Sequence, residues 1–336
     1  MNLASIVTPP VDAPLLRVDG LRTVFRLADG RECPAVDGIS FEIGRGETLG
    51  LVGESGSGKS VTALSIIRLV MPPGRITGGR IEFEGRDLMT LGEDDLRRVR
   101  GRRIGFVFQE PMVALNPVYT IGSQIAETVS VHKLARGQAA KRRAIDLLEA
   151  VRVPDPARRA REYPHQLSGG LRQRAMLALA LAAEPTLLIA DEPTTALDVT
   201  VQAEVLDLLR DLRRRFSLSV LLITHDLGVI AEMADRVAVM YCGRIVEHAS
   251  VAELFKSPAH PYTRGLLASI PGVQSGDRLA AIPGTVPPLG KFGAGCTFAP
   301  RCGDRFEPCT AEVPAVTHLD AGHSVRCYLH ESTRPT

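Results

Sequence analysis

The sequence contains no tryptophan, and aromatic residues make up only 4% of the chain. Its net charge of +2 provides no strong basic field, so we expect no nucleic-acid partner. Apolar runs such as Ala175–Ala183 fall far short of the roughly 20 residues that a membrane span requires. The amino terminus lacks a basic segment followed by a long apolar stretch, so we predict no signal peptide. These absences predict a cytosolic globular protein that reaches a membrane only through partners.

The chain of 336 residues is long enough for two domains around a sizeable core. Residues 1–14 are proline-rich, and we expect them to be flexible. Residues 15–257 alternate strand-like apolar runs with helical periods, whereas residues 258–336 are rich in turns and cysteines. We therefore place a boundary near Pro258, between an α/β domain and a smaller carboxyl-terminal extension.

Hydrophobic periodicity gives the coarse element order of the main domain. It predicts strands at Leu15–Val18, Val36–Ile43, Arg80–Glu84, Arg103–Gln109, Leu187–Asp191, Ser219–Thr224, Arg236–Tyr241 and Arg244–His248. It predicts helices at Ser60–Val70, Asp94–Arg102, from near Ile121, at 137–152, Leu171–Ala183 and Gln202–Phe216.

A glycine-rich loop lies at residues 50–62, GLVGESGSGKSVT, between a strand-like and a helix-like run. Gly53, Gly58, Lys59 and Ser60 fit the pattern G-x-x-x-x-G-K-[ST] of a triphosphate-binding loop. Glycines allow backbone N–H groups to turn toward an anion, and a helix that starts at Lys59 adds its positive end. We predict that Lys59 binds phosphate and that Ser60 ligates Mg²⁺. The alternative is a chance Gly/Ser turn, which the complete pattern in a strand–loop–helix setting disfavours.

Polar residues stand at the ends of three buried-strand patterns. Asp191 ends the apolar run LLIAD, and Glu192 follows it directly. His225 follows the run SVLLIT, and Gln109 ends the run RIGFVFQ. Because ligands bind at the carboxyl ends of strands in open α/β sheets, we expect these side chains to meet there. Beside a phosphate loop, Asp191 is predicted to hold Mg²⁺ and Glu192 to activate water, although solvated surface acids are the alternative.

A second helix start follows the loop REYPHQLSGG. Ser168 has the character of an N-cap, and the pair Gly169-Gly170 allows a ligand to approach the backbone closely. Arg172 in the first helical turn is electrostatically unfavourable unless an anion lies nearby. These residues predict a second phosphate-binding helix end, with an ordinary capped helix as the alternative.

Taken together, these motifs resemble the nucleotide-binding subunit of an ATP-binding cassette (ABC) transporter over residues 15–255. LSGG at 167–170 is similar to the family signature. Asp191 and Glu192 match the Walker B aspartate and the catalytic glutamate, and Asp198 matches the D-loop aspartate. The resemblance implies an α/β fold, the P-loop NTPase ABC nucleotide-binding domain. This fold combines a RecA-like core and an antiparallel β part with a helical subdomain over about 110–183.

The resemblance also implies the site residues. ATP is expected to contact Phe25, Gly53, Glu54, Ser55, Gly56, Ser57, Gly58, Lys59, Ser60, Val61, Ser168, Gly169, Gly170 and Asp198. The alternative for Phe25 is a place in the core, because a lone aromatic is more often a core residue. Catalytic roles are implied for Glu192, His225 and Gln109, and Mg²⁺ contacts for Ser60, Gln109 and Asp191.

Three further segments are similar to the oligopeptide/dipeptide importer subfamily. They are QEPM…LNP at 109–117, HPYT at 260–263 and GCTFAPRC at 295–302. This resemblance implies an ATPase that energises uptake of dipeptides or oligopeptides. Nickel, glutathione or another small solute remains an alternative cargo. A soluble ABC ATPase without a transporter is disfavoured, because the chain carries neither a second cassette nor a long coiled-coil insertion.

The family resemblance implies several partners. They are a second ATPase subunit, expected to be a paralogue, two transmembrane permease subunits and an extracytoplasmic substrate-binding protein. The chain would then lie on the cytoplasmic face of the membrane. Residues 110–125 carry apolar side chains that we expect to be exposed and to receive a permease helix, with an ordinary packed subdomain as the alternative: Met112, Val113, Leu115, Val118 and Tyr119.

Four cysteines cluster in the extension, at Cys296, Cys302, Cys309 and Cys327. Their spacing indicates a tetrathiolate metal site but fits neither the usual zinc nor the usual ferredoxin pattern. The subfamily carries the same pattern, which favours a [4Fe–4S] cluster, with zinc as runner-up and disulfides or free thiols as the remaining alternative. Other candidate residues are predicted to stay outside this site: His318 and His323 as unused ligands, and Cys33 and Cys242 as packed thiols.

Overall fold

The computed structural model describes residues 13–195, 197–270 and 282–331. Its strands are β1 (Leu16–Arg26), β2 (Glu32–Ile43), β3 (Thr48–Val52), β4 (Gly74–Phe83), β5 (Arg86–Asp87), β6 (Ile104–Val107), β7 (Leu187–Asp191), β8 (Ser219–Thr224), β9 (Arg236–Tyr241), β10 (Arg244–Ser250), β11 (Thr317–His318) and β12 (Ser324–Val325). Its α-helices are α1 (Lys59–Ile66), α2 (Glu93–Val99), α3 (Pro111–Ala114), α4 (Ile121–Val131), α5 (Gln138–Ala150), α6 (Pro156–Arg159), α7 (Gly169–Leu181), α8 (Val199–Phe216), α9 (Leu227–Met233), α10 (Val251–Lys256), α11 (Pro261–Ala268) and α12 (Pro308–Ala311). Short 3₁₀ helices are η1 (Leu88–Thr90), η2 (Pro164–Gln166), η3 (Ala299–Arg301) and η4 (Tyr328–His330). None of these helices is both long and apolar enough to cross a bilayer.

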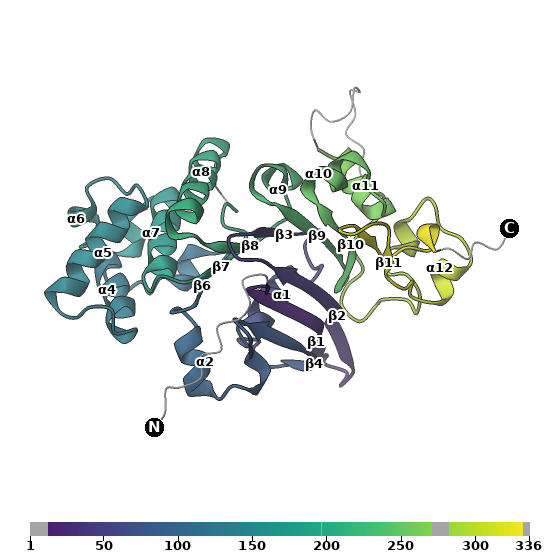
Figure 1. Cartoon of the computed structure of the whole chain (residues 1–336), viewed down its shortest axis with the longest axis horizontal. Coiled ribbons are helices and arrows are strands. Elements are labelled where there is room, and N and C mark those ends of the chain that lie inside the picture. Colours follow the sequence, from purple (N-terminus) through teal and green to yellow (C-terminus); the bar gives the residue numbers. More distant parts are fainter. Residues whose placement is uncertain (1–12, 196, 271–281, 332–336) are drawn as a thin grey trace.

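Two sheets form the body of the molecule (Figure 1). The larger has eight strands in the order β11-β12-β10-β9-β3-β8-β7-β6, and the smaller has four in the order β2-β1-β4-β5. Strands β3, β6, β7, β8 and β9 pair in parallel, whereas the smaller sheet is antiparallel. Helix α1 packs between the sheets, where one apolar core includes Leu16, Leu49, Ile66 and Ile189.

The central strands follow from continuous apolar sequence. Every residue of β3, β7 and β8 is buried, as expected for parallel strands covered on both faces. The predicted bounds of β7 and β8 are confirmed at both ends. In contrast, β4 begins at Gly74 rather than at the predicted Arg80, because its first half pairs with β1, where Phe25 faces Gly74.

Helices α4 to α7 gather at one end of the molecule, on the left in Figure 1. The predicted start of α4 is confirmed, since Thr120 Oγ1 accepts a bond from the Ser123 N–H at 3.4 Å and caps the helix. Apolar side chains of these helices share one core with the parallel sheet, including Ile125, Leu147 and Leu177. The helical end is therefore packed directly onto the β6–β7 edge of the sheet.

The carboxyl-terminal extension continues the main sheet. Strand β12 pairs with β10, and β11 pairs with β12. The fully buried Glu247 of β10 accepts backbone bonds from Ala259 and His260 at 2.7 and 2.8 Å. Its Oε1 also lies 2.8 Å from His323 Nε2. The extension is thus joined to the sheet by buried polar contacts as well as by strand pairing.

Candidate active site

The glycine-rich loop connects β3 to α1 and needs its glycines for steric reasons. A Cβ at Gly53 would lie 2.1 Å from the Met240 carbonyl oxygen. Gly58 caps α1 with φ 103°, and a Cβ there would lie 2.3 Å from the Ala35 carbonyl oxygen. The loop is therefore held close to two neighbouring backbone segments, and its N–H groups can turn toward an anion.

Lys59 is held within this loop. Its side chain is only 5% exposed, and Nζ donates to the carbonyl oxygens of Gly53 and Glu54 at 2.7 and 3.0 Å. Burial lowers the pKa of Lys59, while the carboxylates of Glu192 and Asp191 oppose that shift. The lysine is therefore a desolvated cation at the start of α1, suited to bind phosphate.

Ser60 and Asp191 meet beside the lysine as predicted. Ser60 Oγ donates to Asp191 Oδ1 at 3.1 Å, and Asp191 is 6% exposed at the end of β7. Burial raises the pKa of Asp191, and the bond from Ser60 opposes that shift. Mg²⁺ is commonly bound by one or two carboxylates together with substrate phosphates. This hydroxyl–carboxylate pair is therefore a fitting protein contribution to a magnesium site.

Glu192 lies at the centre of the predicted catalytic residues. Its Oε2 accepts from Gln109 Nε2 at 3.2 Å and lies 3.4 Å from His225 Nδ1. Thr195 Oγ1, which the sequence analysis missed, also donates to Oε2 at 2.7 Å. Glu192 itself has φ 47°, an uncommon left-handed conformation for a residue with a side chain. The Gln109 amide and the Thr195 hydroxyl thus both donate to one carboxylate oxygen at the edge of the sheet, and the His225 ring lies beside it.

Two cavities surround these residues. One, of about 350 Å³, is lined by Phe25, Lys59, Ser60 and other phosphate-loop residues. The second, of about 640 Å³, is lined by Gln109, Glu192 and His225, among others. Both volumes fall in the usual range for small-molecule sites, about 300–1,000 Å³. The first cavity places Phe25 beside the phosphate loop, where a ring could stack on a base.

The carboxyl-terminal extension contributes walls to both cavities. Leu289 and Phe292 line the cavity beside Phe25. Gly284, Thr285 and Val286 line the one beside Glu192. The sequence analysis did not predict these residues, because no motif or periodicity links this proline-rich segment to the phosphate loop.

The second predicted phosphate-binding helix end lies elsewhere. Ser168 caps α7, with its Oγ accepting from the Leu171 N–H at 3.4 Å, and Asp198 caps α8. Among the described residues, neither these caps nor the Gly169-Gly170 pair lines the two cavities. Helix α7 lies with the other helices at one end, whereas α1 lies near the middle of the molecule (Figure 1).

The side chain of Arg172 has hydrogen-bond partners within its own chain. Its Nε donates to the Pro164 carbonyl oxygen at 2.8 Å and its Nη2 to that of His165 at 3.4 Å, so the chain itself supplies its partners. Gly170 also has a packing reason, because a Cβ there would lie 2.7 Å from Val201 Cγ1. Gly169 is different: it is exposed, and a Cβ there would make only an ordinary contact, 3.7 Å from Leu197 Cδ2.

Comparisons with known proteins agree with this geometry. A family described as ABC transporter matches residues 36–195, and one described as oligopeptide/dipeptide transporter, C-terminal region, matches residues 246–309. The oligopeptide transport ATP-binding protein AppD of Bacillus subtilis (strain 168) is 51% identical over 319 residues, covering 94% of this chain and 97% of that protein. The chain belongs to the oligopeptide/dipeptide family of ABC transporter ATP-binding proteins. As a member, it is an ABC ATPase.

Other relatives extend the comparison for this ABC ATPase. A putative peptide import ATP-binding protein of Brucella melitensis biotype 1 is 51% identical over 327 residues, covering 94% of this chain and 96% of the relative. Among solved structures, the ATP-binding cassette MJ0796 in a dimeric state bound to ADP and Pi has a TM-score of 0.63 and 27% identity. The matched region covers 70% of this chain and 98% of the MJ0796 chain. The P-loop ABC fold is therefore confirmed.

The segment after Gln109 is partly exposed, as predicted. Val113 is 77% exposed, and Met112, Val118 and Tyr119 are also exposed. The expectation for Leu115 was wrong: it is 1% exposed and packs in the helical core of this ABC ATPase. Leu115, which directly follows α3, is therefore buried, whereas Met112 and Val113 of α3 are exposed to solvent.

The four clustered cysteines line one small cavity of about 10 Å³. All six cysteines of the chain are free, so the disulfide alternative is not realised. Burial raises the pKa of Cys296 and Cys302, and that of Cys327 to about 11. Within the described ranges, no three His, Cys, Asp or Glu side chains are arranged to hold a metal ion. The thiols converge, but the expected metal geometry is not present.

The remaining candidate ligands stay outside this cavity. His323 is buried against Glu247, and His318 is an exposed residue of β11. Cys33 and Cys242 are both buried, as expected for packed thiols, and Cys242 belongs to the main apolar core.

Proposed function

We propose that this chain hydrolyses ATP to drive import of short peptides across the cytoplasmic membrane. The observation that carries the proposal is the meeting of Lys59, Ser60, Asp191 and Glu192 at one sheet edge, in a chain whose carboxyl-terminal region matches peptide transporters. The relatives named above are described as oligopeptide or peptide import ATP-binding proteins, which supports a peptide cargo.

The residues at the sheet edge have different roles in hydrolysis. Lys59 and the loop N–H groups bind the phosphates, and Ser60 and Asp191 hold Mg²⁺, which supplies charge neutralisation. Glu192 polarises the attacking water. The fixed position of its carboxylate supports this role, because a base must be aligned before the reaction.

Three further residues complete the proposed site. His225 contacts the γ-phosphate, and Gln109 joins the metal and the γ-phosphate to the segment that follows it. The contacts of both side chains with Glu192 support these positions. Phe25 stacks on the adenine base, which its place beside the phosphate loop supports.

The N-terminus of α7 contacts ATP that is bound to a second ATPase subunit. Ser168, Gly169 and Gly170 would bind the γ-phosphate of ATP held on the partner's loop, and Asp198 would complete that interface. Their distance from this chain's own cavities supports the arrangement, as does the exposed position of Gly169. ATP then holds two subunits together, and its hydrolysis removes the bridging contact. The partner is a paralogue.

The exposed apolar residues after Gln109 contact a permease subunit. Met112, Val113, Val118 and Tyr119 present apolar surface directly after a residue of the catalytic cluster. Two permeases and an extracytoplasmic binding protein complete the importer, and this chain lies on the cytoplasmic face. A cysteine at position 113 should crosslink to a permease in the intact complex, and its failure to do so would contradict this contact.

The four thiols bind a [4Fe–4S] cluster, with a single zinc ion as the alternative. The donor set supports a thiolate site, as does His260, which lines the same cavity and whose Nε2 has no partner among the described residues. The cavity has the volume of about one water molecule, so the thiols must move apart to admit a cluster. A bound cluster or zinc ion would crosslink the turns that carry the four cysteines. Iron and sulfide in a brown preparation would support the cluster, and stoichiometric zinc without iron would refute it.

The whole proposal is tested by transport. The chain, its partner ATPase, the permeases and the binding protein are reconstituted in liposomes, with ATP on the side of the ATPases. Labelled dipeptides and longer peptides should accumulate only with ATP, and nickel or glutathione should neither accumulate nor compete. ATP-dependent uptake of nickel or glutathione instead of peptides would contradict the cargo, and uptake without this chain would contradict its role.

A further inference from the structure

The phosphate-loop residue Glu54 has its partners in the carboxyl-terminal region. Nη1 and Nη2 of Arg301 donate to its two carboxylate oxygens at 2.6 and 3.1 Å. The hydroxyl oxygen of Tyr262 accepts from its backbone N–H at 2.9 Å. These partners lie 247 and 208 residues further along the chain, inside the match to the oligopeptide/dipeptide transporter region. Both the side chain and the backbone of one loop residue are therefore fixed from outside the cassette core.

Arg301 is itself firmly placed. Its side chain is 5% exposed, and its Nε donates to the Pro283 carbonyl oxygen at 2.8 Å. Its guanidinium lies 5.8 and 6.0 Å from the ring centres of Tyr241 and Phe298, within reach of cation–π attraction. A buried guanidinium with partners on its edges and faces has a single orientation available. The two Nη groups of Arg301 are therefore held in a defined position from which they bond to the Glu54 carboxylate.

Glu54 in turn contacts Lys59, the lysine proposed to bind phosphate. Its carbonyl oxygen accepts from Lys59 Nζ at 3.0 Å and from the Ser57 N–H at 3.2 Å. A displaced Glu54 would therefore move the lysine contact and the first turn of the loop together. An unpaired Glu54 carboxylate would also repel the triphosphate.

We infer that Arg301 is a positioning residue for the phosphate loop, through which the carboxyl-terminal region sets the affinity for ATP. It acts through Glu54 and does not itself contact the nucleotide. The inference rests on the proposed role of Gly53–Ser60 in binding ATP.

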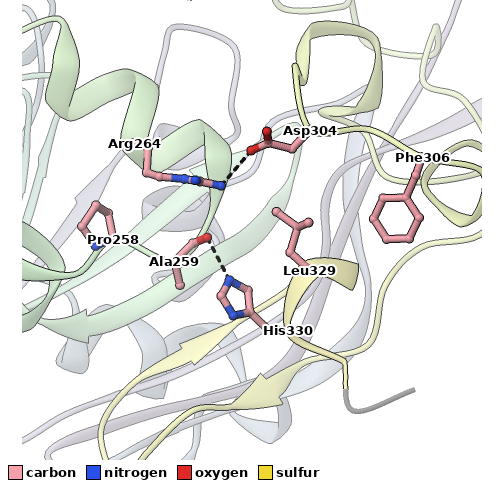
Figure 2. A pocket seen from close by; sticks show the side chains of 7 residues that line it. All are labelled: Pro258, Ala259, Arg264, Asp304, Phe306, Leu329 and His330. Carbon is pink, nitrogen blue, oxygen red and sulfur yellow. Dashed lines mark hydrogen bonds and ion pairs between the residues drawn. The ribbon is translucent and has the colours of Figure 1, made fainter. Parts of the chain in front are cut away.

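A second ion pair lies wholly within the carboxyl-terminal extension and does not touch the phosphate loop. Arg264 of α11 donates to Asp304 Oδ2 at 2.9 Å beside a cavity of about 660 Å³ (Figure 2). On the opposite side of the cavity, His330 Nε2 lies 3.0 Å from the Ala259 carbonyl oxygen. Both side chains of the ion pair are half-exposed, and such pairs contribute little to stability. Arg264→Met is therefore a control for loss of an arginine ion pair of the extension that does not reach the phosphate loop.

The experiment compares Arg301→Met, Arg301→Lys and Arg264→Met in the full chain, with a fluorescent ATP analogue for affinity and with kcat and KM in the assembled importer. Arg301→Met should weaken analogue binding and raise KM about tenfold, because it leaves the partner carboxylate unpaired. Its kcat at saturating ATP should change less than about threefold, since the interaction is made equally before and during hydrolysis. Arg301→Lys keeps the positive charge but loses the planar guanidinium that bonds to both carboxylate oxygens. Its affinity for the analogue should therefore lie between those of the parent chain and Arg301→Met. Arg264→Met should match the parent chain.

A Glu54→Gln background tests whether Arg301 acts through Glu54. There, Arg301→Met should weaken binding by less than about threefold further, because the two changes remove one interaction. Unchanged analogue affinity in Arg301→Met, or the full tenfold loss in this background, would overturn the inference. Thermal unfolding identifies any variant that does not fold, and Arg301→Lys then supplies the decisive affinity.

Lys59→Ala separates this inference from the proposed function. Unchanged analogue affinity in Lys59→Ala would contradict the ATP site itself. A large loss in Lys59→Ala with none in Arg301→Met would contradict only the role of Arg301.

Discussion

Replacing Glu192 by glutamine would remove one charge from the centre of the site while keeping the size of the side chain. Glu192 Oε2 lies 2.7 Å from Thr195 Oγ1, 3.2 Å from Gln109 Nε2 and 3.4 Å from His225 Nδ1. A carboxylate accepts from the threonine hydroxyl and the glutamine amide, whereas an amide offers one acceptor oxygen and two donor hydrogens. The substitution therefore keeps the backbone arrangement but removes the base and disturbs its anchoring.

The magnitude follows from what the carboxylate does. A positioned general base contributes about 10²- to 10⁴-fold to a reaction rate, so hydrolysis should fall by that factor. ATP binding should be retained or should tighten slightly. Glu192 is a negative neighbour of Lys59, and its charge would repel the phosphates that the lysine attracts. The substitution should therefore separate binding from turnover.

Two measurements on the assembled importer check this separation. Analogue binding should be equal to or tighter than that of the parent chain, while phosphate release falls at least about 100-fold. Thr195→Val is the matched control, because it removes one donor but keeps the carboxylate, and its phosphate release should fall by less than about tenfold. Near-normal phosphate release by Glu192→Gln would refute the assignment. Loss of analogue binding would show that the residue shapes the site rather than the hydrolytic step.

Three further substitutions test other parts of the site and fold. Lys59→Ala should weaken ATP binding at least about 100-fold, because it removes a desolvated cation from the phosphates; equal affinity in a titration would contradict the loop. Phe25→Ala should weaken ATP binding about tenfold, while Phe25→Tyr retains it, if the ring stacks on adenine; equal Kd values for both would place Phe25 in the core only. Leu115→Ala should lower the free energy of unfolding by about 2–5 kcal/mol, while Val113→Ala changes it by less than about 0.5 kcal/mol. Similar losses in urea melts would contradict the buried position of Leu115 and the exposed position of Val113.

Local sequence patterns predicted the parts of the structure that local chemistry determines. The bounds of β7 and β8 follow from unbroken apolar runs, because a parallel strand covered on both faces has no polar position inside it. Side chains at the ends of these strands can then be predicted to lie close together, since the carboxyl ends of parallel strands lie at one edge of the sheet. This explains why Gln109, Glu192 and His225 could be grouped although they lie far apart in the chain.

The features that were missed depend on contacts between distant segments. Leu115 is buried in the main apolar core although Met112 and Val113 are exposed, because it directly follows α3, which packs against α7. Arg172 satisfies its charge with the carbonyl oxygens of Pro164 and His165, which no helix-dipole argument from sequence could foresee. Phe292 enters the cavity beside Phe25 from the far end of the chain. Such approaches require the folded topology and carry no periodic signal.

The charge balance of the two cavities gives a physical reason for a second subunit in the proposed mechanism. Among the described residues that line them, Lys59 is the only lysine or arginine, and its pKa is lowered by burial. A bound triphosphate would stabilise the charged lysine, but one buried cation and one metal ion leave part of the phosphate charge uncompensated. Helix N-termini bind such charge without adding another buried cation. The α7 start has this character, yet it lies away from its own chain's cavities. In the proposed mechanism, the N-terminus of α7 in another subunit adds to the compensation that this chain's own loop and α1 provide, which would make the affinity for ATP and the association of the two subunits one coupled equilibrium.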